Sequence, residues 1–330
     1  MLHDASGRTI TSLRISLTDR CNLRCRYCMP ETGVEKLRHE DILTFAEILR
    51  IVRAMAALGV RKVRLTGGEP LVRRGIVELV QAIHEVPGIE RVVMTTNGVL
   101  LSELAAPLLA AGLDGVNISL DTLRPEVFAG ITRRPMLDQV REGIQALQAQ
   151  GLQDIKFNCV PIESVNEADI PALAGLAREQ AVKVRFIELM PIGCAYEVGY
   201  HGVAMAAVRQ QLEQAYGPLR QVGSPAGTLA GPAVYYRLPG LSGQVGFTDA
   251  MEHKFCTSCN RVRLTAEGFL KLCLNAKTGL DLRALLRSGI TDENLQLAVR
   301  QAIYHKPAEH RFEDKNNDVR DGRAMYQVGG

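Results

Sequence analysis

Long apolar runs are missing from this sequence of 330 residues. None reaches the ~18 apolar residues of a membrane-spanning helix. The opening residues, MLHDASGRTI, lack the apolar core of a signal peptide. A strong excess of one charge is missing too, because the net charge is only +3. We therefore expect a cytoplasmic chain that binds neither membrane nor nucleic acid.

Low-complexity tracts are also absent, while 46% of the residues are hydrophobic and 23% are charged. That balance is typical of a globular protein and excludes a disordered one. The length suffices for one barrel-sized domain and a smaller unit. We expect a first domain over 1–198 and a second region over 199–330.

Three cysteines stand close together in the stretch CNLRCRYCMP, at Cys21, Cys25 and Cys28. A closed zinc site needs four ligands and a disulfide framework needs an even number of cysteines, so neither explains the trio well. A four-iron cluster takes one external ligand on each iron, and three thiolates would leave one iron open. Scattered core thiols are the alternative, but the interleaved Arg24 and Arg26 are not typical of a core.

Short β-branched runs alternate with longer amphipathic stretches at a spacing of about thirty residues, which is the rhythm of βα units. The pattern predicts helices at FAEILRIVRAMAALG and LDQVREGIQALQAQG, each with a glycine near its end. It predicts parallel strands that begin at Ser12, Lys62, Arg91, Gly115, Ile155 and Lys183.

Unusual residues follow each predicted strand: TDRC, TGGEP, TTNG, SLD, NCVP and LMP. In a parallel barrel, complete or not, the carboxyl ends of the strands carry the catalytic loops, so these segments would converge on one cavity. A doubly wound open sheet remains the structural alternative at this point. After about Gly199 the rhythm ends, and Gly- and Pro-rich sequence predicts irregular structure with short antiparallel strands.

A second cysteine trio lies in that later region, in CTSCNRVRLTAEGFLKLC, at Cys256, Cys259 and Cys273. Here zinc is a serious competitor, because the spacing is that of a zinc ribbon and His253 could be a fourth ligand. The remaining cysteines, Cys159 and Cys194, are interpreted as packing or cavity-lining residues.

Together these motifs resemble a known family. The C-x3-C-x2-C spacing after a first strand, with Tyr27 before the last cysteine and GGEP after the second strand, resembles the radical S-adenosylmethionine (SAM) enzymes. The later trio and the terminal Gly329–Gly330 are similar to the GTP 3′,8-cyclases of molybdenum cofactor biosynthesis, over nearly the whole chain. The resemblance implies an α/β fold, an incomplete TIM-type (β/α)6 barrel with a C-terminal region covering the barrel mouth.

The resemblance also implies cofactors. It implies two [4Fe–4S] clusters, one on Cys21, Cys25 and Cys28 and the other on the later trio, with SAM bound to the open iron of the first cluster. Cleavage of SAM would give a 5′-deoxyadenosyl radical. The SAM contacts that it implies are Tyr27, Gly68, Ser119 and Met190, although Gly68 could merely form a tight turn, Ser119 cap a helix and Met190 pack in the core.

For the substrate, the resemblance implies that GTP binds at the second cluster and that its triphosphate meets fixed cations, for which arginine is well suited. Lys and Arg are ordinarily solvated surface residues, but charges inside a barrel would be costly without a bound anion. The implied GTP contacts are Arg14, Arg64, Thr95, Lys156, Arg261, Val262 and Arg263, with Arg185 and Lys62 as further candidates.

The expected reaction converts GTP to 3′,8-cyclo-7,8-dihydro-GTP by abstraction of the ribose C3′ hydrogen. The implied partners are a cyclic pyranopterin monophosphate synthase and an electron donor such as flavodoxin or ferredoxin, and a homodimer is compatible with the resemblance. Two alternatives stay open: a two-cluster radical SAM enzyme that acts on a peptide, and a zinc-stabilised nucleotide-binding regulator. The terminal glycines could thread into the barrel mouth, because they lack side chains and tolerate unusual backbone angles.

Overall fold

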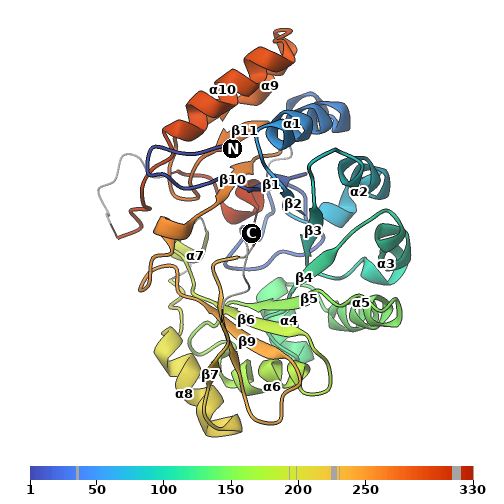
Figure 1. The fold of residues 1–330 in the computed structure, drawn as a ribbon. Helices are drawn as coiled ribbons and strands as arrows, with labels where there is room; N and C mark the ends of the chain where they lie inside the picture. Colours follow the sequence, from blue (N-terminus) through green and yellow to red (C-terminus); the bar gives the residue numbers. More distant parts are fainter. Residues whose placement is uncertain are drawn as a thin grey trace.

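The computed structural model describes residues 1–34, 37–192, 194–197, 199–223, 229, 231–313 and 321–329. Within these residues the strands form one curved sheet in the order β12-β11-β10-β1-β2-β3-β4-β5-β6-β9-β8-β7. The central strands from β10 to β9 are parallel, and a hairpin at each edge is antiparallel. Figure 1 shows the sheet as an arc with helices along its outer side.

All six predicted strands are confirmed, each beginning at its predicted residue. They are β1 (Ser12–Ser16), β2 (Lys62–Thr66), β3 (Arg91–Thr96), β4 (Gly115–Ser119), β5 (Ile155–Cys159) and β6 (Lys183–Ile187). The later strands are β7 (Arg220–Gln221), β8 (Val234–Arg237), β9 (Gln244–Thr248), β10 (Arg261–Leu264), β11 (Phe269–Lys271) and β12 (Gly279–Asp281).

The two helices predicted from the sequence are also confirmed. Helix α1 (Phe45–Ala57) begins at a capping box in which Thr44 Oγ1 accepts from Glu47 N (3.2 Å) and Glu47 Oε2 accepts from Thr44 N (2.7 Å). The second is α5 (Leu137–Ala149). The other helices are α2 (Ile76–His84), α3 (Leu101–Ala110), α4 (Pro125–Thr132), α6 (Ile170–Ala174), α7 (Cys194–Glu197), α8 (Met205–Tyr216), α9 (Leu282–Arg287), α10 (Asp292–Tyr304) and α11 (Met325–Val328).

The two faces of the sheet differ sharply in chemistry because successive side chains alternate across a strand. One set of positions is apolar and almost fully buried, as in Leu13, Val63 and Phe157, and it forms the core beneath the helices. The other set is polar or basic, as in Arg14 and Arg64. A doubly wound sheet would bury apolar side chains on both faces, so the incomplete barrel with a polar interior is the correct alternative.

Residues after 198 add strands to both ends of the parallel sheet. Strand β9 pairs with β6 in parallel, and β10 pairs with β1 in parallel. The chain ends inside the curve of the sheet, near α11 (Figure 1). The C-terminal region therefore extends the barrel wall and also reaches its interior.

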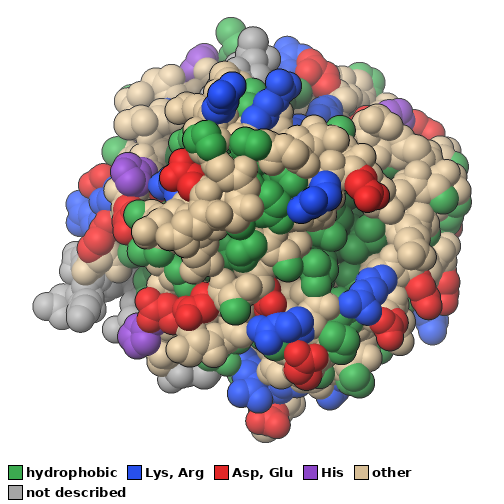
Figure 2. Space-filling model, turned by 90° about the horizontal axis from the view of Figure 1, so that it is seen from below, with side chains coloured by type: hydrophobic (Ala, Val, Ile, Leu, Met, Phe, Trp, Pro, Cys, Tyr) green, Lys and Arg blue, Asp and Glu red, His purple; other side chains and the backbone are tan. Residues whose placement is uncertain are grey.

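The outer surface is mixed in charge. Figure 2 shows one face of the molecule, on which basic and acidic side chains are interspersed. None of the described helices is both long and apolar enough to cross a bilayer.

Candidate active site

The first cysteine trio lies on the loop that follows β1. Cys21, Cys25 and Cys28 are half-buried free thiols. Burial raises the pKa of Cys21 to about 11, and burial together with the charge of Cys21 raises that of Cys28 to about 12. Backbone N–H groups point at the sulfurs: Leu23 N lies 3.4 Å from Cys21 Sγ, and Tyr326 N–H donates to Cys28.

These thiols fit a polynuclear cluster better than a single ion. They lie close enough for their charges to oppose one another, and hydrogen-bond donors directed at sulfur stabilise thiolate ligands. Across the part of the chain that the structure describes, no three His, Cys, Asp or Glu side chains converge as one metal ion requires. Three thiolates are the ligand set of a four-iron cluster that keeps one iron open.

The glycine pair after β2 allows the cysteine loop to approach the sheet. Gly67 has φ +142°, and an added Cβ would lie 2.6 Å from Thr18 O. A Cβ on Gly68 would lie 2.4 Å from Arg20 O, and Gly68 N donates to Thr18 O (2.7 Å). Gly68 thus has a structural role next to Cys21, in addition to the SAM contact that the resemblance implies.

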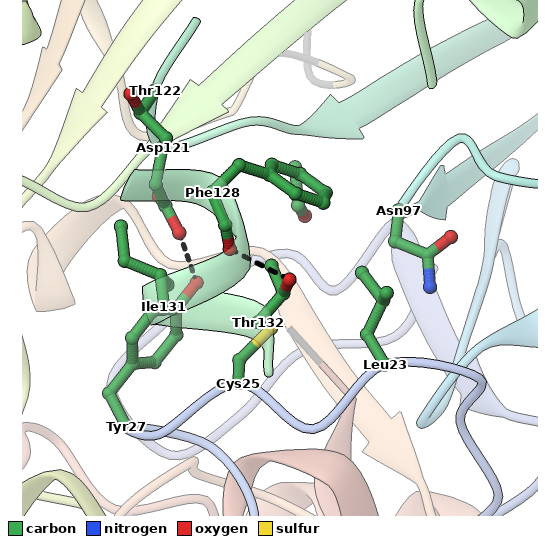
Figure 3. A pocket seen from close by; sticks show the side chains of 10 residues that line it. Leu23, Cys25, Tyr27, Asn97, Asp121, Thr122, Phe128, Ile131 and Thr132 are labelled. Atoms are coloured by element: carbon green, nitrogen blue, oxygen red, sulfur yellow. Dashed lines mark hydrogen bonds between the residues drawn. The ribbon is translucent and has the colours of Figure 1, made fainter. Parts of the chain in front are cut away.

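The cysteine loop, the segments that follow β3 and β4, and helix α4 meet at a pocket beside Cys25 (Figure 3). Tyr27 and Ser119, both implied SAM contacts, line it. Tyr27 Oη donates to Asp121 Oδ2 (2.6 Å) in the loop after β4. Burial raises the pKa of Asp121 to about 6, although the bond from Tyr27 opposes that rise. The pocket therefore joins the cysteine loop to the carboxyl ends of the strands.

Asn97, which follows β3, also lines this pocket and ties it to the trio. Its Nδ2 donates to Asn22 Oδ1 (2.7 Å) and lies 3.7 Å from Cys21 Sγ. Its backbone N–H donates to Glu69 Oε2 (2.7 Å). Met190, the fourth implied SAM contact, lies half-buried after β6 and is not among the described residues that line the pocket.

The second trio lies near the amino end of β1, whereas the first trio follows its carboxyl end. Cys256 and Cys259 flank the short turn before β10, and Cys273 follows β11. Burial is the main cause that raises the pKa of Cys256, and the charges of Cys273 and Cys259 also raise it. The three thiols are therefore near one another. Burial also opposes ionisation of Cys259, but Lys306 and Arg261 together lower its pKa to about 7.

The zinc alternative for this trio required His253 as a fourth ligand. The His253 side chain is 75% exposed, and its Nδ1 lies 3.4 Å from Asp249 Oδ2. His253 is thus engaged with a carboxylate and is not placed as a thiolate partner. The three thiols again fit a cluster ligand set.

Arginines line the barrel interior between the two trios. The strand register pairs Arg14 on β1 with Arg64 on β2 and with Arg263 on β10, so the three lie on neighbouring strands at one level. Burial lowers the pKa of Arg14 well below its ordinary value, and Arg263, Arg261, Arg64 and Arg185 lower it further. Burial and Arg185 likewise lower the pKa of Arg64 to about 9. Such crowding of cations indicates a site for a polyanion.

Polar side chains hold these guanidinium groups in place. Arg64 Nη1 donates to Thr95 Oγ1 (3.1 Å). The Asn117 amide oxygen, turned towards the arginines, accepts from Arg64 Nη1 and Arg185 Nη2, both at 2.6 Å. Lys156 pairs with Asp154, which also accepts from Arg91 Nη2 (2.8 Å).

The carboxyl-terminal segment enters this cavity. Arg263 Nη1 donates to the carbonyl oxygens of Val328 (3.4 Å) and Gly329. Gly329 has φ +75° and lies against Thr66 at the end of β2. Gly330 lies outside the described residues. The segment therefore contacts the arginine cluster, and Tyr326 on the same segment contacts the first trio.

Val262, another of the implied GTP contacts, lies between Arg261 and Arg263 on β10. The side chain of Val262 is 1% exposed and packs on the apolar face opposite Leu13, so it does not face the cavity. Asn97, Asn117 and Asp121 were missed as site residues. Asn97 and Asp121 lie in the TTNG and SLD segments at the ends of predicted strands, and that position could have indicated them as site residues.

Comparison with known proteins agrees with this geometry. Residues 15–177 match the radical SAM superfamily, and residues 182–312 match the family described as Molybdenum Cofactor Synthesis C. The chain is 44% identical to a GTP 3′,8-cyclase of Clostridium perfringens and 46% identical to one of Pelotomaculum thermopropionicum, in each case over 100% of both chains. This chain belongs to the GTP 3′,8-cyclase family.

The solved structure of Streptococcus suis SuiB bound to S-adenosylmethionine has the same fold. The TM-score is 0.61 at 16% identity, over 90% of this chain and 67% of that one. As a member of the radical SAM superfamily, this GTP 3′,8-cyclase family uses SAM and a [4Fe–4S] cluster, and its members carry a second cluster.

Proposed function

We propose that the protein is a GTP 3′,8-cyclase that converts GTP to 3′,8-cyclo-7,8-dihydro-GTP for molybdenum cofactor biosynthesis. The full-length identity to relatives with this name supports the reaction. One observation supports GTP as the substrate: Arg14, Arg64 and Arg263 lie side by side on neighbouring strands inside the barrel. The four charges that lower the pKa of Arg14 are all arginines, and a triphosphate would supply the compensating negative charge.

In this proposal Cys21, Cys25 and Cys28 hold the SAM-binding cluster, and the later trio holds the second. When bound, SAM and the first cluster supply a 5′-deoxyadenosyl radical that removes the hydrogen from ribose C3′. The protein residues bind, orient and exclude water. Tyr27, Ser119 and Asp121 shape the SAM side of the cavity.

The remaining implied contacts complete the substrate side of the proposal. Thr95 and Asn117 fix the guanidinium groups of Arg64 and Arg185, so that these cations are already in place when the phosphates arrive. Arg261 lies between the second trio and the cavity, with its guanidinium over the Phe255 ring at 4.9 Å. Lys156 and Lys62 add charge at the amino ends of the strands.

The two alternatives have less support. A peptide substrate suits SuiB, which has been solved bound to the precursor peptide SuiA, but that likeness extends only to the fold. A peptide would also leave the arginine cluster without an obvious partner. The regulator alternative has Cys21, Cys25 and Cys28 as zinc ligands, and the full-length identity to GTP 3′,8-cyclases favours an enzyme instead.

Location and partners follow from the chemistry. All eight cysteines are free thiols, which suits a reducing compartment, so we place the protein in the cytoplasm. The cyclic product would pass to a cyclic pyranopterin monophosphate synthase. A low-potential electron carrier such as flavodoxin or ferredoxin would reduce the first cluster.

The test is anaerobic incubation of the reconstituted protein with dithionite, SAM and GTP, followed by identification of the nucleotide product by mass and NMR. The cyclised nucleotide is expected with GTP but not with ATP. SAM cleavage without any change to GTP would overturn the proposed substrate.

A further inference from the structure

A group of arginines surrounds the first cysteine trio on the outside of the protein. We call Arg20, Arg24, Arg26, Arg133 and Arg134 the arginine collar. The first three lie on the cysteine loop, and the other two directly follow α4. Arg20, Arg26 and Arg134 are exposed, so the collar lies where this loop meets solvent.

The two parts of the collar form one continuous surface. Arg24 N donates to Thr132 O (2.9 Å) and Arg26 N donates to Ile131 O (3.0 Å), which fastens the cysteine loop to the end of α4. Arg133 Nη1 donates to the carbonyl oxygens of Arg24 (2.9 Å) and Met29 (3.1 Å).

Not every member of the collar has the same task. Arg24 and Arg133 are structural, because their guanidinium groups donate to loop carbonyls and Arg133 adopts φ +56° to do so. Arg20, Arg26 and Arg134 are exposed, and none of their side chains pairs with a described carboxylate. The one described carboxylate that pairs with the collar is Glu31, 3.9 Å from Arg133 Nε and 82% exposed.

A local excess of exposed positive charge needs a reason in a protein whose net charge is only +3. Unpaired surface arginines contribute little to the stability of the fold, but they attract and orient an oppositely charged partner. The arginines assigned to the nucleotide lie on strands β1, β2 and β10, whereas the collar lies on the cysteine loop and after α4. The collar therefore has no task in the proposed binding of GTP.

We propose that the arginine collar docks a small acidic electron-carrier protein beside the first trio. This inference rests on the proposed function, in which the cluster on that trio must receive an electron. The carrier is oxidised by one electron and the cluster is reduced by one, with no bond formed or broken. Docking at the collar brings the carrier to the part of the loop that holds the cluster ligands.

The test compares the wild type with the double variant Arg26→Glu/Arg134→Glu, using flavodoxin as the acidic carrier. The control, Arg300→Glu, changes an exposed arginine on α10, which Figure 1 places well away from α4. The affinity of oxidised flavodoxin for the cluster-loaded protein is measured by calorimetry, which requires no turnover. Formation of 5′-deoxyadenosine is then measured with reduced flavodoxin and, separately, with dithionite.

We expect the double variant to bind flavodoxin about tenfold more weakly or worse, as charge reversal at a docking rim predicts, and to cleave SAM correspondingly more slowly with that donor. With dithionite it should match the wild type, and Arg300→Glu should match it throughout. Wild-type binding should also weaken as salt is added. If the double variant does not load its cluster, Arg134→Glu alone carries the test, because Arg134 lies outside the cysteine loop.

Unchanged flavodoxin affinity and unchanged flavodoxin-driven cleavage in the charge-reversed protein would overturn the docking proposal. Failure of the proposed function looks different: the wild type would then form no cyclised nucleotide even with dithionite.

Discussion

At the scale of single residues, the arginines inside the barrel repel one another, and a bound anion would offset that repulsion. Arg14 faces Arg64 and Arg263 on the adjacent strands. Like charges on adjacent strands oppose folding of the protein without its ligand. A bound triphosphate would accept charge-assisted hydrogen bonds from the same groups. A mutation here should therefore affect binding and stability in opposite directions.

Replacing Arg14 with Ala should weaken GTP binding by about 2 kcal/mol, the scale for loss of a charge-assisted hydrogen bond. SAM affinity should be unchanged. The unliganded variant should melt no lower than the wild type, because repulsion from Arg64 and Arg263 is relieved. Calorimetry with each ligand and thermal melting check these outcomes, with Arg300→Ala on the outer surface as control. Equal losses of GTP and SAM affinity would indicate general damage instead.

Lys62 should make GTP binding dependent on pH. Burial, followed by the charges of Arg64, Lys156 and Arg91, lowers its pKa in the empty cavity to about 7. Below that pH the side chain is charged before and after binding. Above it, the neutral amine takes up a proton when the phosphates arrive, so GTP affinity should fall as the pH rises from about 7.

The proton uptake on GTP binding is measured by calorimetry at a pH about one unit above that pKa, in two buffers that differ in ionisation enthalpy. Lys62→Met should reduce it, with the remainder assigned to Lys156, whose pKa burial lowers to about 8. The same uptake in the variant and the wild type would remove Lys62 from this role.

At the scale of elements, the carboxyl-terminal segment is the part that joins the two halves of the site. Its beginning is anchored by Asp321, which pairs with the fully buried Lys271 on β11. Its end places Gly329 against Thr66 and donates no side chain to the cavity. An anchored segment loses less conformational entropy on entering the cavity than a free terminus would.

Gly329→Ala should displace the end of this segment. The new Cβ would lie 2.3 Å from Thr66 Cγ2, at a φ of +75° that L-residues seldom adopt. We expect both clusters to assemble and GTP to bind, but the yield of cyclised nucleotide to fall sharply, as it should when Gly329 and Gly330 are deleted. Gly322→Ala is the matched control, because nothing lies within 4 Å of its Cβ. Full product yield from Gly329→Ala would show that the segment is dispensable.

The elements that the sequence predicted well were those fixed by local pattern. The six strands begin at their predicted residues because β-branched runs with polar ends mark them clearly. What local pattern could not predict was pairing: β9 and β10 join β6 and β1 from far along the chain. Pairing also decides which side chains of β10 face inward: the register places Arg263 beside Arg14, while the Val262 side chain is buried beside Leu13.

At the scale of the whole molecule, the two trios are separate sites that should lose iron independently. Cys256→Ala should lower the iron content by about one four-iron cluster per chain, and Cys25→Ala should do the same at the first site. Only Cys25→Ala should abolish 5′-deoxyadenosine formation. Elemental analysis and the SAM cleavage assay check this; about one zinc per unmodified chain, with no iron lost from Cys256→Ala, would contradict the cluster assignment.

The central claim is that the barrel holds GTP with its ribose facing the SAM-binding trio, and one isotope measurement tests it most directly. GTP carrying deuterium at C3′ is incubated anaerobically with the reconstituted protein, SAM and dithionite, and the 5′-deoxyadenosine formed is examined by mass spectrometry. The account predicts one deuterium in 5′-deoxyadenosine and its loss from the cyclised nucleotide. Unlabelled 5′-deoxyadenosine, with deuterium retained in the recovered nucleotide, would contradict it.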